Sequence, residues 1–112
     1  MKYYCDLYLS KSLIKKQKEI IRKLEAKKFL INKFLIVLSD NEDEYLEIYN
    51  WTVLTQPLFN PNEMFVIGIA DSYGDALQYI TKLTQTVYEE TKDGNVKDYI
   101  INKQQQYEES NK

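Results

Sequence analysis

The stretch 64-MFVIGIADSYGDALQYI-80 changes its hydrophobic pattern halfway along, and this change decides the fold class. Residues 64–70 are almost continuously apolar, which is typical of a buried strand, and the run stops at Asp71. From Tyr73 to Thr91 the apolar residues recur at three- and four-residue spacing, which predicts an amphipathic helix. A strand therefore passes directly into a helix, and the fold must combine both kinds of element.

The turn between this strand and this helix is the segment most like a ligand site. Ser72 is followed three residues later by Asp75, and an S-x-x-D pair predicts a helix N-cap. A helix N-terminus also attracts anions. However, the glycine-rich phosphate pattern and the Walker lysine are missing, and the carboxylates of Asp71 and Asp75 would repel a phosphate. We interpret the turn as a capped junction, with a small-ligand site as the alternative.

Further elements are expected on both sides of this junction. The alternating or apolar runs at 3–9, 33–39 and 45–54 predict strands, and the patterns at 12–28 and 95–102 predict helices. The order β-α-β-β-β-α-α predicts an α+β fold, a two-layer sandwich in which a mixed four-stranded sheet carries its helices on one face.

The connections favour one topology and one domain. The first two strands should be parallel through a right-handed crossover, and the last three should form an antiparallel meander. Residues 1–102 should form a single domain, and residues 103–112 a polar, frayed tail. The segments 40–44 and 55–63 should be a polar turn and a loop.

The composition argues against several classes of activity. The 112 residues contain no histidine and one cysteine, Cys5, which excludes Ser-His and Cys-His catalysis, an intrachain disulfide and a cysteine-bound zinc ion. Nothing sets two carboxylates across a cleft, so we expect no enzyme and no cofactor. The acidic turn 40–44 departs from the calcium-loop pattern at its decisive positions, so we expect a hairpin turn there and no metal site.

The source and the location are also suggested by composition. The bias toward Lys, Ile, Asn and Tyr is typical of an AT-rich coding sequence and suggests a bacterial or phage protein. No apolar run has the length of a membrane span, and the N-terminus lacks a signal-peptide pattern, so we expect a cytoplasmic protein with no membrane contact.

The charge is distributed unevenly along the chain. Residues 11–33 contain nine basic and two acidic residues, a net charge of +7, whereas the whole chain carries −2. This basic helix is either a solvated outer face or a surface for phosphate groups or an acidic partner. Eight of its nine basic residues are lysines, whereas bidentate phosphate recognition favours arginine, so a nucleic-acid-associated regulatory role is the alternative function. The expected basic face contains Lys15, Lys16, Lys18, Arg22, Lys23 and Lys27.

The aromatic residues are the most informative feature, since the chain has ten Tyr, four Phe and one Trp. Tyr4 and Tyr8 lie on the polar side of the first strand, and Tyr45, Tyr49 and Trp51 share one side of the third. If the helices cover the other side, an open aromatic face remains. We predict that this face joins two copies of a non-enzymatic protein that acts through protein–protein contact, with an unidentified protein as a further partner. Base stacking on this face is one alternative, and covering by the last helix or the tail is another.

Overall fold

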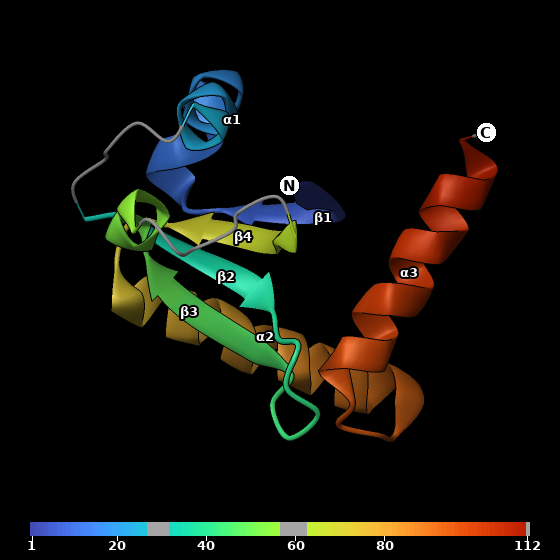
Figure 1. Cartoon of the computed structure of the whole chain (residues 1–112). Helices are drawn as coiled ribbons and strands as arrows, with labels where there is room; N and C mark the ends of the chain where they lie inside the picture. Colours follow the sequence, from blue (N-terminus) through green and yellow to red (C-terminus); the bar gives the residue numbers. More distant parts are fainter. Residues whose placement is uncertain (27–31, 57–62, 112) are drawn as a thin grey trace.

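Four strands form one mixed sheet in the computed structural model, which describes residues 1–26, 32–56 and 63–111 (Figure 1). They are β1 (Lys2–Leu9), β2 (Phe34–Leu38), β3 (Leu46–Asn50) and β4 (Phe65–Ala70). Their spatial order is β1-β4-β2-β3. β1 and β4 are parallel, whereas β2 is antiparallel to both β3 and β4. The α+β fold class with a mixed four-stranded sheet is therefore confirmed.

The helices of the described part of the chain follow the expected positions with shifted ends. They are the 3-10 helices η1 (Lys11–Lys16) and η2 (Trp51–Thr55) and the α-helices α1 (Gln17–Glu25), α2 (Tyr73–Thr91) and α3 (Val96–Ser110). The strand expected at 45–54 ends at Asn50, because the Asn50 side chain accepts the N–H of Thr52 at 3.1 Å and starts η2. Residues 27–28 of the first expected helix and most of the expected loop 55–63 lie outside the described residues.

The strand order corrects the expected connectivity. β4 lies between β1 and β2, so β2, β3 and β4 do not form a meander. β1 is parallel to β4, and it therefore runs antiparallel to β2 instead of parallel to it. The burial of the strands explains this order. Nearly every residue of β4 is buried, which suits an interior strand, whereas β3 is only partly buried and takes an edge.

The helices divide between the two faces of the sheet, where the sequence predicts a single helical layer (Figure 1). On one face, Leu24 of α1 and Trp51 of η2 belong to the core cluster of Leu35. On the other face, Val87 of α2 belongs to the cluster of Ile36, together with residues of α3. Successive side chains of a strand point to opposite faces. Because successive residues of β2 and β4 are apolar, both faces need a cover.

The segment 103–112, expected as a frayed tail, is helical as far as Ser110. Gln104 gives the physical reason, because its buried carboxamide replaces a neighbouring strand at the edge of β1. The carboxamide oxygen accepts the N–H of Cys5 at 2.7 Å, and the carboxamide nitrogen donates to the carbonyl of Tyr3 at 3.5 Å. The helix is thus held by polar contacts, which leave no apolar periodicity in the sequence.

Candidate functional site

The fold separates the five aromatic residues that the sequence places on one open face. Trp51 is 0% exposed in the core on the α1 side of the sheet, and Tyr4 is buried in the core on the other side. Tyr8 packs on the same side as Tyr4, whereas Tyr49 packs on the side of Trp51. Tyr45 is the well-exposed member of the set. An open aromatic sheet face is therefore not formed, and for Tyr4 the alternative of covering by the last helix holds.

The turn between β4 and α2 is capped as the sequence predicts. The hydroxyl of Ser72 accepts the N–H of Asp75 at 3.0 Å and caps the helix. The Asp75 carboxylate also accepts hydrogen bonds from the hydroxyl of Tyr8, at 2.6 Å, and from Ser10. Burial, and then the bond to Asp75, raise the pKa of Tyr8. These contacts tie the start of α2 to the end of β1.

Asp71 forms the second half of this polar cluster. Its N–H donates to the hydroxyl of Ser10 at 2.8 Å, and its carboxylate accepts from Ser12 and from the Lys33 ammonium at 2.9 Å. The serine, lysine and aspartate groups are thus bonded to one another at the carboxyl ends of the parallel strands. This geometry favours the junction interpretation over an anion site, since both carboxylates lie where an anion would bind.

The acidic turn 40–44 connects β2 and β3 as a hairpin, as expected. Asn41 shapes the turn, because its side chain accepts the N–H of Asp43 at 3.0 Å while its own N–H donates to Ser39. Within residues 1–26, 32–56 and 63–111, no group of three His, Cys, Asp or Glu side chains is arranged to hold a metal ion.

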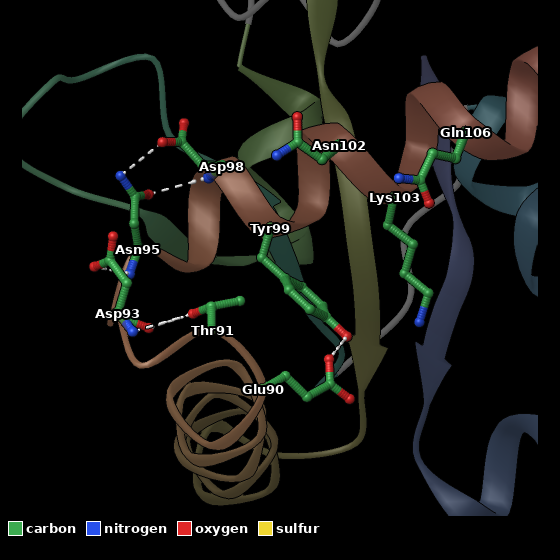
Figure 2. A pocket seen from close by; sticks show the side chains of 9 residues that line it. All are labelled: Glu90, Thr91, Asp93, Asn95, Asp98, Tyr99, Asn102, Lys103 and Gln106. Atoms are coloured by element: carbon green, nitrogen blue, oxygen red, sulfur yellow. Dashed lines mark hydrogen bonds between the residues drawn. The ribbon is translucent and has the colours of Figure 1, made fainter.

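A groove of about 510 Å³ lies between the end of α2 and the start of α3 (Figure 2). Its carboxylates contact neighbouring side chains: Glu90 accepts the hydroxyl of Tyr99 at 2.8 Å, and Asp98 accepts the Asn95 amide at 3.0 Å. The ammonium of Lys103 is bound to Asp6 of β1 at 2.5 Å. The groove is therefore a helix–helix junction whose charged groups are already engaged.

The expected basic face is exposed on η1 and α1. Its fully exposed members, Lys15, Lys16, Lys18 and Arg22, form no ion pair with a residue that the structure describes. Lys23 is half-buried and pairs with Glu19 at 3.0 Å, whereas Lys27 lies outside the described residues. Ile14, also well exposed, lies in the same segment. The described part of this surface therefore carries an excess of positive charge, which Glu19 offsets in part through its interactions with Lys23, Arg22 and Lys16.

An exposed apolar stripe on α2 is the surface that the sequence pattern does not reveal. We name it the α2 stripe, and it contains Tyr73, Leu77, Ile80, Thr84 and Tyr88. Tyr73, Leu77 and Tyr88 are 53%, 45% and 59% exposed. Spacings of three and four residues place all five on one side of the helix. The sequence pattern assigns most of them to the buried face. The feature that could have revealed this surface is the width of the apolar arc of the helix, which exceeds what contact with one face of a sheet requires.

The α2 stripe faces the β3 side of the sheet. The buried residues of α2, Ala76 and Val87, separate the stripe from Tyr79. Tyr79 stacks on Tyr8 of β1, with ring centroids 4.3 Å apart. The first residue of the stripe, Tyr73, meets the ring of Phe34 in β2 edge to face, with centroids 6.1 Å apart. Because the strand order is β1-β4-β2-β3, the stripe lies on the side of α2 that is away from β1 and toward β3.

β3 is an edge strand in the described part of the chain, and it pairs with β2 alone. At one end the N–H of Trp51 donates to the carbonyl of Lys33 at 2.9 Å. At the other end the N–H of Ser39 donates to the carbonyl of Tyr45 at 3.1 Å. Antiparallel pairing alternates, so the odd-numbered residues of β3 bond to β2 and the even-numbered ones direct their backbone groups outward. The outward residues are Leu46, Ile48 and Asn50.

The other face of β3 carries a polar pair. The hydroxyl of Tyr49 donates to the carboxylate of Glu47, which also accepts the hydroxyl of Ser39 at 2.9 Å. The bond from Tyr49 lowers the pKa of Glu47, and the same bond raises the pKa of Tyr49 to about 12. Glu47 is therefore charged and Tyr49 neutral at physiological pH.

Comparisons of the chain with protein-family models, with curated proteins and with solved structures found no match. No described helix has the length and apolar character needed to cross a membrane.

Proposed function

We propose that this chain is a non-enzymatic protein that acts through protein–protein contact and associates with itself. The observation that carries this proposal is the α2 stripe beside the edge of β3. Three of its side chains, Tyr73, Leu77 and Tyr88, each expose about half of their surface. Aromatic side chains are enriched at protein interfaces, and a contiguous exposed apolar surface marks a contact site. We therefore propose a contact surface on α2, and the burial of Trp51 and Tyr4 within the monomer supports this choice over the aromatic sheet face.

The engaged polar clusters support the non-enzymatic part of the proposal. The carboxylates of Asp71 and Asp75 bond to serine, tyrosine and lysine side chains of the same cluster, which leaves them poorly placed to act on a substrate. The chain also lacks histidine, and Cys5 is a free cysteine. A single free cysteine agrees with the cytoplasmic location that we propose.

The mass of the protein in solution tests the proposal. Size-exclusion chromatography with light scattering should give a dimer for the wild type and a monomer for Leu77→Glu, because a two-fold contact would bury two new charges. Thr86→Glu is the matched control, since this exposed residue lies on the opposite side of α2 from Leu77 and should leave the dimer intact. A wild-type monomer at all concentrations, or a dimeric Leu77→Glu variant, would overturn the proposal.

A second candidate function is the binding of a nucleic acid, and one observation favours it. Among the described residues, the exposed lysines of η1 and α1 and Arg22 form no ion pair with a carboxylate. Such a surface would bind phosphate groups with an affinity that falls steeply as salt rises. Fluorescence anisotropy with labelled DNA and RNA tests this candidate, and Lys15→Glu with Arg22→Glu should abolish the binding. No detectable affinity at low salt would refute it.

A further inference from the structure

We infer that the partner at the α2 stripe is a second copy of this chain, joined through β3 against β3 so that the sheet continues across a two-fold axis. This inference rests on the proposed function above and adds the partner, the strand and the register. The outward backbone groups of Leu46, Ile48 and Asn50 are the first support, since an extended strand can add to such an edge by main-chain hydrogen bonds.

The two-fold axis sets the direction of the added strand. An axis perpendicular to the sheet places the two β3 strands antiparallel, and each residue then faces the position related to it by the axis. Only registers that pair the outward residues of both copies are compatible with the edge. For this strand of five residues, such registers centre on Glu47, on Ile48 or on Tyr49.

The side chains of β3 select the register centred on Ile48. A centre at Glu47 would place two carboxylates directly opposite each other, which is destabilising. A centre at Tyr49 would pair only three of the five residues of β3 and leave Leu46 and Glu47 outside the pairing, whereas a centre at Ile48 pairs all five. The centre at Ile48 pairs this residue with its own copy and places Glu47 opposite Tyr49 of the second copy. Glu47 and Tyr49, which bond to each other within the monomer, would then also face each other across the axis.

The α2 stripe is also compatible with a two-fold axis. The midpoint of the stripe along the helix lies between Ile80 and Thr81. A two-fold axis at this midpoint sets Tyr73 opposite Tyr88 of the second copy. Tyr73 lies at the end of β2 that pairs with Asn50. From Tyr73 to Ile80 the helix rises about 10 Å, and from Asn50 to Ile48 the strand spans about 7 Å. Ile80 and Ile48 pack against the same core cluster, and the inferred axis passes near both of them.

The absence of charge on the stripe favours a copy over a charged partner. The α2 stripe itself contains only tyrosine, leucine, isoleucine and threonine; Lys82 borders it, lining one shallow hollow with Leu77, and Glu89 lies on another side of α2. A basic or acidic partner would find no counter-charge on this stripe. An identical stripe meets it without like-charge repulsion.

Disulfide crosslinking tests the register. In a Cys5→Ser background, Ile48→Cys should form a covalent dimer under mild oxidation, because facing hydrogen-bonded residues of an antiparallel pair have Cα atoms about 5.5 Å apart. A mixture of Leu46→Cys and Asn50→Cys should also crosslink, whereas Leu46→Cys alone should not. Gln105→Cys, exposed on α3, is the control. We expect at least a tenfold higher yield for Ile48→Cys than for this control, with unchanged far-UV circular dichroism.

The outcomes separate the two proposals. If the wild type is a monomer by light scattering, the self-association in the proposed function fails, and the register fails with it. If the wild type is a dimer that Leu77→Glu dissociates, but neither Ile48→Cys nor the mixture of Leu46→Cys and Asn50→Cys crosslinks, the register centred on Ile48 is overturned while the self-association stands. Crosslinking in a mixture of Leu46→Cys and Ile48→Cys, without a homodimer of either, would move the centre to Glu47 and overturn the register.

Discussion

Replacing Trp51 by alanine should destabilise the monomer severely. Among the described residues, Trp51 has the largest fully buried side chain, and it lies in the core between η2, α1 and the sheet. Truncation of a buried aromatic residue to alanine costs about 3–5 kcal/mol, against a total folding free energy of about 5–15 kcal/mol. At about 4 °C per kcal/mol for a chain of this size, a loss of about 4 kcal/mol lowers the Tm by about 15 °C.

Urea unfolding followed by circular dichroism, at equal concentrations of wild type and variant, measures this loss. The fixed concentration matters because self-association adds to the apparent stability. Trp51→Phe, which keeps an aromatic ring in the core, is the control and should lose less than half as much. The alternative, that Trp51 lies at an open interface, predicts a folded monomer of nearly normal stability. A Trp51→Ala variant within about 1 kcal/mol of the wild type would refute the buried assignment.

Three other changes follow from particular contacts. Gly68→Ala should cost about 1–3 kcal/mol, because the new Cβ would lie 2.9 Å from the Cβ of Tyr8. Gly74→Ala, in open space in the first turn of α2, should instead stabilise by about 0.5–1 kcal/mol, and urea unfolding that gives both variants the same sign would contradict this contrast. Gln104→Ala should cost about 1–3 kcal/mol by leaving an N–H of β1 without its partner, and the exchange of that amide hydrogen should accelerate. Burial raises the pKa of Tyr79 to about 12. The pKa of Tyr79 in the unfolded chain is about 10. The contribution of the protonated Tyr79 to the free energy of unfolding is therefore complete below about pH 10 and is lost as the pH rises through about 12. Tyr79→Phe should flatten the fall in stability over that range, and an unchanged slope between the variants would rule this out.

The local features of the fold could be predicted from the sequence because their signals are local. Ser72 caps α2 through an N–H only three residues away, and the polar turn 40–44 forms a hairpin between two apolar runs. The continuous apolar character of residues 64–70 and 33–39 marks β4 and β2 as strands buried on both faces. Burial on both faces also requires helices on both sides of the sheet, and this step was available from the sequence.

The long-range features had no comparable signal. The place of β4 between β1 and β2 depends on pairs such as Leu9 with Ile69, which are far apart in the chain. The helical end of α3 depends on Gln104, whose partner Cys5 lies 99 residues away. Trp51 lies on the same side of the sheet as Tyr49, as the alternating pattern indicates, but η2 and α1 cover this side, so the expectation that it is open is wrong.

The two edges of the sheet differ in how far other described elements cover them, and this difference limits the number of copies that the proposed pairing can join. At β1 the edge is closed by Gln104, by the ion pair of Lys2 with Glu108 at 2.9 Å and by the ion pair of Lys103 with Asp6. At β3 no described element covers the outward backbone groups. Pairing through β3 therefore uses the open edge once and leaves the closed β1 edges outermost. Because an exposed edge is what lets a sheet keep growing, such an assembly would stop at two copies.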